Sequence, residues 1–269
     1  MNIQRYKDYA FKVIRSGDIT EVYAYREVLY KKLPFEDIQD EKDLCELEDT
    51  ILKNGDSEIV TEVEKVTVDT ETYKRRVSNI LAAKRKITRI IQANAGQYPE
   101  RDKFLTLTFK GEPPERKKVI DDFQYFNKKF KRKYGDKYEY LAVIERGENA
   151  TKRLHLHIVC FNLPRIDKEE LEELWGHGYI YINEIKTAHD IVNYVTKYIE
   201  KTLKDDYIGK GERFYFPSQK LKKPEELFLN DNEFDRFLKY ESLGNPLFQF
   251  EFNSKYVGDC LYQKFMKID

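Results

Sequence analysis

The hydrophobic positions between residues 99 and 205 alternate between the two-residue spacing of strands and the three- to four-residue spacing of helices. They predict, in chain order, a strand over 104–109, a helix of about twenty residues after Pro113-Pro114, strands over 138–147 and 153–161, a short helix over 167–175, a strand over 178–185 and a helix over 191–201. This order predicts an α+β fold with a central, mainly antiparallel sheet of about five strands and helices packed on it.

The flanks of this central segment follow weaker patterns. Residues 1–98 are expected to be mainly helical, because hydrophobic positions between 77 and 91 form one stripe of a helix that ends before Gly96. Beyond residue 204, the segment 213–218 is a candidate strand and 225–240 is a candidate helix. The predicted division is a helical N-terminal region (1–98), a central domain (99–205) and a C-terminal extension (206–269).

The composition is that of a globular chain. Hydrophobic residues make up 41% of the 269 and include 20 Tyr and 17 Phe, enough to build a core in spite of 36% charged residues. No hydrophobic run approaches the length of a membrane span, and the first residues lack the apolar segment of a signal peptide. Cys45, Cys160 and Cys260 are far apart, which disfavours disulfides or a cysteine zinc site and predicts a reduced, cytoplasmic protein.

Charge is segregated along the chain, although 48 acidic and 48 basic residues balance overall. Acidic residues dominate 35–71, whereas 73–91 contains no acid and seven cations: Lys74, Arg75, Arg76, Lys84, Arg85, Lys86 and Arg89. These cations predict contacts with DNA phosphates, and the alternative is that their helix pairs with the acidic segment before it. The stretch 116–137 is also basic and contains aromatic residues, which suits a nucleic acid or, alternatively, a solvated helix face with core aromatics behind it.

Two histidines one residue apart carry the strongest chemical signal. His155 and His157 lie in the predicted strand 153–161, where side chains two apart point to the same face, about 7 Å apart along the strand. A hairpin with the strand 138–147 brings Glu145 beside them. Two imidazoles and a carboxylate form a three-ligand metal site with positions left for water or substrate. The alternative is an exposed glutamate at a strand end and two locally bonded histidines.

A second set of reactive groups shares one helix face. Tyr194, Lys197 and Tyr198 stand at positions i, i+3 and i+4 of the predicted helix 191–201. A phenol, whose pKa is ordinarily about 10, becomes a useful nucleophile when a cation or metal lowers that value. The same cation can balance charge on a phosphoryl group. The alternative is core packing of the tyrosines, with the lysine extending to water.

These motifs resemble those of the HUH endonucleases, in particular the rolling-circle replication initiators (Rep proteins) of small plasmids and phages. The resemblance covers residues 103 to 204 and rests on motifs in a characteristic order. They are the run 104–109, Glu145, His155-Leu156-His157, the Trp175-Gly176 turn, and Tyr194 to Lys197 followed by Tyr198. Each motif is degenerate alone, but the ordered set is specific.

The resemblance implies a metal-dependent DNA endonuclease and strand transferase with a tyrosine nucleophile and a Rep-like sheet related to the ferredoxin-like fold. Glu145, His155 and His157 would hold Mg²⁺ or Mn²⁺, which would polarise the scissile phosphate. Tyr194 would form a 5′-phosphotyrosine and release a 3′-hydroxyl as primer, with Lys197 orienting the phosphate. Tyr198 matches the second tyrosine of the subgroup that alternates two nucleophiles, or else it is a packing aromatic.

The implied partner is origin DNA, single-stranded or in a hairpin at the nick site. No phosphate-binding loop of the helicase type occurs, so unwinding would need a host helicase, and a homo-oligomer is left open. A transposase or relaxase with the same active site is the nearest alternative function. An alternative of another class is a ferredoxin-like nucleic-acid-binding module without enzymatic activity. The His-Glu-x-x-His and Cys-x-x-Cys signatures are absent, which disfavours zinc hydrolases and zinc deaminases.

Overall fold

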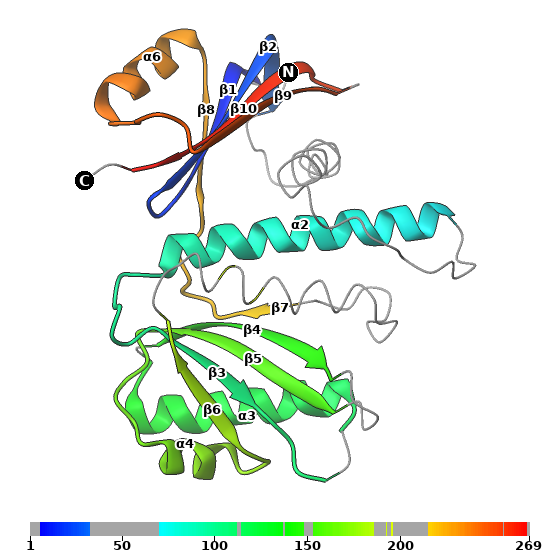
Figure 1. Cartoon of the computed structure of the whole chain (residues 1–269), viewed down its shortest axis with the longest axis vertical. Coiled ribbons are helices and arrows are strands. Elements are labelled where there is room, and N and C mark those ends of the chain that lie inside the picture. Colours follow the sequence, from blue (N-terminus) through cyan, green and yellow to red (C-terminus); the bar gives the residue numbers. More distant parts are fainter. Residues whose placement is uncertain are drawn as a thin grey trace, which may run out of the picture. The chain divides into compact units, whose positions relative to one another are not determined.

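The computed structural model describes residues 6–32, 70–111, 114–136, 138–147, 153–185, 192, 195, 215–254 and 256–267. Within them, four helices and two antiparallel five-stranded sheets form an α+β fold (Figure 1), the class that the sequence predicts. The chain divides into two compact units, Met1–Arg85 with Lys223–Asp269, and Lys86–Lys222. No helix among the described residues is long and apolar enough to cross a membrane.

The sheet of the Lys86–Lys222 unit has the strand order β6-β3-β5-β4-β7, and every neighbouring pair is antiparallel. Its strands are β3 (Lys103–Leu107), β4 (Glu139–Arg146), β5 (Leu154–Phe161), β6 (Ile180–Glu184) and β7 (Tyr215–Pro217). The central strands β4 and β5 are buried over most of their length, which is why they appear as continuous hydrophobic runs in the sequence. The predicted antiparallel sheet is confirmed, and β7 adds a strand from beyond residue 205.

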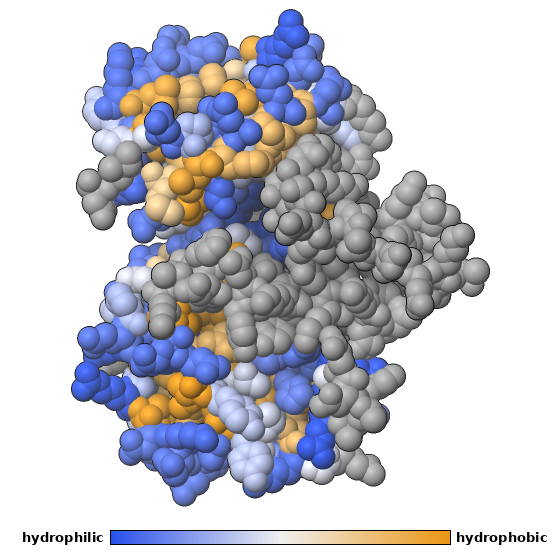
Figure 2. Space-filling model, viewed as in Figure 1, coloured by the Kyte–Doolittle hydropathy of each residue, from blue (hydrophilic) through white to orange (hydrophobic). Residues whose placement is uncertain are grey.

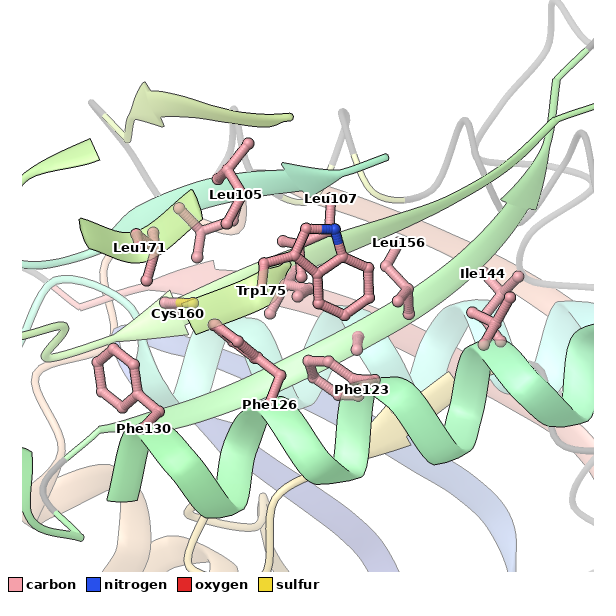
Figure 3. Packing of buried hydrophobic residues seen from close by; sticks show 14 of the residues in the cluster. Leu105, Leu107, Phe123, Phe126, Phe130, Ile144, Leu156, Cys160, Leu171 and Trp175 are labelled. Carbon is pink, nitrogen blue, oxygen red and sulfur yellow. The ribbon is translucent and has the colours of Figure 1, made fainter. Parts of the chain in front are cut away.

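Two helices, α3 (Arg116–Tyr134) and α4 (Lys168–Trp175), cover one face of this sheet (Figure 1). Phe123, Phe126 and Phe130 recur at helical spacing and point from α3 towards the strands (Figure 3). Trp175, at the end of α4, packs edge-on against Phe126 with ring centroids 5.8 Å apart. These phenylalanines are therefore core residues, the alternative that the sequence left open for the aromatics of 116–137.

The other unit contains a sheet with the strand order β8-β1-β2-β10-β9. Its elements are β1 (Tyr6–Ser16), β2 (Ile19–Lys32), β8 (Glu225–Leu229), α6 (Asp231–Tyr240), β9 (Phe248–Ser254) and β10 (Gly258–Met266). Helix α6 packs on one side of this sheet, where Phe234 stacks on Phe11 with ring centroids 3.9 Å apart. At the surface of this unit, hydrophobic side chains lie among hydrophilic ones (Figure 2).

The prediction that residues 1–98 are mainly helical is wrong for the N-terminal part, because residues 6–32 form the β1–β2 hairpin. A turn at Gly17-Asp18 joins the two strands, and Gly17 has a φ of 60°, a conformation that glycine adopts without strain. Val13 faces α6 and Ile14 faces the opposite hydrophobic cluster, which is the two-residue period of a strand. Helix α2 (Thr70–Asn94), in contrast, forms where the basic helix was predicted.

The segment 225–240, predicted as one helix, is divided between β8 and α6. Strand β8 pairs with β1 from Phe11↔Leu229 to Arg15↔Glu225. Helix α6 begins after Asn230, whose side chain accepts a hydrogen bond from Glu233 N at 3.0 Å, while the Glu233 carboxylate accepts one from Asn230 N. This capping box starts the helix at the point where the strand ends. The candidate strand 213–218 is confirmed as β7.

Candidate active site

The two histidines of β5 point to the sheet face opposite α3 and α4. The intervening Leu156 belongs to the core shared with these helices (Figure 3), and alternate side chains of a strand point to opposite faces. His155 is paired with Glu145 on β4, and His157 is paired with Thr106 on β3. The predicted hairpin is therefore present, and it brings Glu145 beside the histidines.

His157 is buried and forms a contact through each ring nitrogen. Its Nε2 atom lies 2.6 Å from Oε2 of Glu145, and its Nδ1 atom lies 3.1 Å from the hydroxyl of Thr106. A carboxylate only accepts hydrogen bonds, so Nε2 donates to Glu145 and, in the neutral ring, Nδ1 accepts from Thr106. The ring also stacks on Phe104, with centroids 5.7 Å apart and planes 21° from parallel. These contacts fix the orientation of the imidazole.

His155 is half-buried and lies beside Gly147, just beyond the end of β4. Its ring centroid is 6.3 Å from that of His157. A Cβ atom on Gly147 would stand 3.5 Å from Cε1 of His155 and 3.2 Å from the carbonyl oxygen of Arg153, so this position is tight. Burial first, and the charge of His157 second, lower the pKa of His155. At neutral pH the ring is therefore uncharged, the form in which imidazole binds metals.

Glu145 and His157 supply two converging atoms, Oε2 and Nε2. Among the residues that the structure describes, no group of three or more histidine, cysteine, aspartate or glutamate side chains is arranged to hold a metal ion. The ring of His155 lies beside this pair, with its centroid 6.3 Å from that of His157. The three-ligand metal site therefore stays a prediction.

The predicted nucleophile and its neighbours, Tyr194, Lys197 and Tyr198, lie outside the described residues. Within the predicted helix, Val192 and Val195 are described, both are helical, and Val195 is buried. The strands before and after this segment in the sequence, β6 and β7, form the two edges of the sheet. The histidine strand β5 thus lies between the points where the segment leaves and rejoins the sheet.

The seven cations predicted to contact DNA lie on α2, and their described side chains differ in exposure. Arg85 and Arg89 are buried, Lys84 is half-buried and Lys86 is exposed. Lys74, Arg75 and Arg76 have side chains outside the described part. Because the arginines four residues apart share one face of the helix, that face is turned inward, and Lys86 is the described cation best placed to meet DNA. The DNA contact itself stays a prediction.

Thr106 and Thr108 of the β3 region are site residues that the sequence pattern did not single out. Besides the bond from Thr106 to His157, Nε1 of Trp175 donates to the carbonyl of Thr108 at 2.8 Å, which attaches the Trp-Gly turn to the end of β3. Gly178 fits there because a Cβ atom would lie only 2.3 Å from the Thr108 oxygen. The signal in the sequence is the alternation within 104–109, where threonines occupy the positions between core residues.

Comparison with known proteins agrees with the motifs. No curated protein and no solved structure gives a significant match to the chain. Residues 102–203 match the family model described as Replication-associated protein, of the ORF2 type. The segment that contains Glu145, His155 and His157 therefore belongs to a family of rolling-circle replication initiators, with which the HUH superfamily is consistent.

Proposed function

We propose that this protein nicks and rejoins single-stranded origin DNA through a covalent 5′-phosphotyrosine and thereby starts rolling-circle replication. The observation that carries the proposal is the contact between His157 and Glu145 within the family-matched segment. Both side chains are buried, and buried polar groups in a hydrophobic strand are costly. Such groups cluster at functional sites, so their presence here supports catalysis.

Glu145, His155 and His157 would hold the Mg²⁺ or Mn²⁺ that the resemblance implies. When bound, the ion acts as a Lewis acid on the scissile phosphate. One carboxylate and two imidazoles suit this role, because they leave positions for phosphate oxygens and water. To offer a lone pair at Nε2, His157 has to carry its hydrogen on Nδ1 instead. The Thr106 hydroxyl accommodates this change, since it can accept a hydrogen bond from Nδ1 as well as donate one.

Tyr194 would be the nucleophile. Its phenolic oxygen loses a proton and bonds to phosphorus, while the bond from phosphorus to the 3′-oxygen breaks and that oxygen takes up a proton. The products are a 5′-phosphotyrosine and a free 3′-hydroxyl that primes synthesis. Lys197 would offset charge on the phosphoryl group, and Tyr198 would attack in a second transfer that rejoins the strand.

Origin DNA, single-stranded or in a hairpin, is the proposed partner, and a host helicase would unwind the duplex. A transposase or relaxase would use the same chemistry, but the family match favours the replication initiator. A nucleic-acid-binding module without activity would leave the His157–Glu145–Thr106 contacts without a purpose.

The test is covalent capture of DNA. Single-stranded fragments tiled across the replicon that carries this sequence are labelled at the 3′ end, incubated with the protein and Mn²⁺, and run on a denaturing protein gel. An adduct that requires the metal and is lost in Tyr194→Phe supports the proposal. If wild-type protein binds these fragments and forms no adduct with any of them, the binding module is the better assignment.

A further inference from the structure

Two tyrosines at the edge of the catalytic sheet leave their rings in water. Tyr181 lies on the edge strand β6 and Tyr179 just before it, and each is 55% exposed. A lysine ammonium accompanies each ring, with Lys110 Nζ 4.9 Å from the centroid of Tyr179 and Lys168 Nζ 6.0 Å from that of Tyr181. Exposed aromatic rings beside cations match the chemistry of unpaired bases joined by phosphates.

Strand register places Tyr181 on the same side as the histidines. Tyr181 is paired with Thr106, which in turn is paired with His157. The side chains of directly paired residues share a face, and the Thr106 side chain contacts the His157 ring. Two strand spacings, about 10 Å, therefore separate the backbones of Tyr181 and His157 across the sheet. Bases next to a phosphate bound at His157 would lie within reach of this tyrosine.

The backbone that carries the two tyrosines is held in place. Tyr179 N donates to the hydroxyl of Thr108 at 2.9 Å, and Tyr179 O accepts from Thr108 N at 3.0 Å. Between the tyrosines, Ile180 N donates to the Glu172 carboxylate at 2.9 Å, which satisfies an edge-strand group that would otherwise face water. A surface fixed in this way loses little conformational freedom when it binds a ligand.

We propose that Tyr179 and Tyr181 form a stacking platform for the unpaired bases next to the scissile phosphate, with Lys110 and Lys168 countering the backbone charge. The substrate class, single-stranded DNA, rests on the proposed function. Stacking is tolerant of sequence because every base has a π-face. The platform would thus hold the strand in position beside the catalytic groups, whichever bases occupy it.

Tyr125 provides a matched control within the same unit. It is 61% exposed and has Lys129 Nζ 5.0 Å from its ring centroid, so its local chemistry resembles that of the two platform tyrosines. Tyr125 lies on α3, however, which covers the other face of the sheet. Exposure and a neighbouring lysine are shared by all three residues, and only the position relative to His157 differs.

Binding is measured by fluorescence anisotropy in the presence of a chelator, with a labelled oligothymidylate of about fifteen nucleotides and an abasic deoxyribose-phosphate chain of the same length. Tyr179→Ala and Tyr181→Ala should each weaken oligothymidylate binding about tenfold, equivalent to about 1.4 kcal/mol. Binding of the abasic chain should not change, the Phe variants should bind like wild type, and Tyr125→Ala should have no effect.

Equal losses on both ligands, or no loss on oligothymidylate, would overturn the platform, as would a wild-type protein that binds the two ligands equally well. The assay needs no cleavage, so its result is independent of the adduct test. An adduct with unchanged binding in the Ala variants would keep the proposed function and reject the platform. Reduced oligothymidylate binding without any adduct would keep the platform and reject the nuclease.

Discussion

The Nε2 atom of His157 and the Oε2 atom of Glu145 lie 2.6 Å apart on neighbouring antiparallel strands, and both side chains are buried. The contact joins two groups that the sequence predicts as metal ligands before any metal is bound. Leaving a buried polar group without a partner costs about 1–3 kcal/mol. Substitutions at this pair therefore affect stability as well as function, and the two effects require separate measurements.

Glu145→Gln should keep an acceptor for His157 while removing the negative charge. We expect its thermal unfolding midpoint to stay near that of the wild type, whereas Glu145→Ala should lose about 1–3 kcal/mol of stability. Both variants should require at least about tenfold more Mn²⁺ for adduct formation. An unchanged metal titration in Glu145→Gln would remove this residue from the metal site.

Thr106→Val should remove the hydroxyl that contacts Nδ1 of His157 and preserve the shape of the side chain. The expected loss in the free energy of unfolding is about 1 kcal/mol. Metal affinity in the adduct assay should fall about 10- to 100-fold, because the orienting partner of a ligand is lost. Thr106→Ser retains the hydroxyl and serves as the control. Equal metal titrations for the two variants would show that Thr106 does not orient His157.

Stability should depend on pH through His155. Its pKa is lowered mainly by burial, so the folded value lies below the unfolded value of about 6.5. Between the two values the unfolded chain binds more protons, and the free energy of unfolding therefore rises with pH until it levels off above about 6.5. Urea unfolding across this window should show stability falling with acidification, with a flatter dependence in His155→Gln. An identical dependence in that variant would assign the effect to another group.

The two tyrosines of the predicted nucleophile helix should separate in function. Tyr194→Phe should bind single-stranded DNA and unfold like the wild type, yet produce neither nick nor adduct, because the attacking oxygen is missing. Tyr198→Phe should still nick but fail to complete strand transfer on a substrate with two origins. A complete cycle in Tyr198→Phe would make Tyr198 a packing residue. An adduct in Tyr194→Phe but not in Tyr198→Phe would exchange their roles.

Lys86 is the exposed cation of α2 whose removal tests a contact with duplex DNA. Lys86→Gln should lower the slope of log affinity against log salt by up to about 0.9 on an origin duplex. Lys117, exposed on α3, is the control position, and Lys117→Gln should leave the slope as it is. Equal slopes for wild type and Lys86→Gln would support the alternative in which this helix does not meet DNA.

Local periodicity was enough to predict the elements from β3 to β6 and the histidine arrangement. His155 and His157 share a face because a strand repeats every two residues, and Glu145 reaches them because the two strands follow one another in the chain. The same reasoning failed for residues 6–32, although the Gly17-Asp18 turn between alternating hydrophobic residues is a hairpin signal. There the basic helix farther along was extended over a segment with a different period.

The sequence by itself determined the chemistry available, namely a histidine pair, a nearby glutamate and a Tyr-x-x-Lys-Tyr face in a defined order. Only the tertiary structure decided that Thr106 is the partner of His157 and that β8 is a strand rather than the start of a helix. Both outcomes depend on pairing between distant parts of the chain: Arg15 and Glu225, which bond across β1 and β8, are 210 residues apart. A short hydrophobic run is compatible with helix or strand until a neighbouring strand supplies its hydrogen bonds.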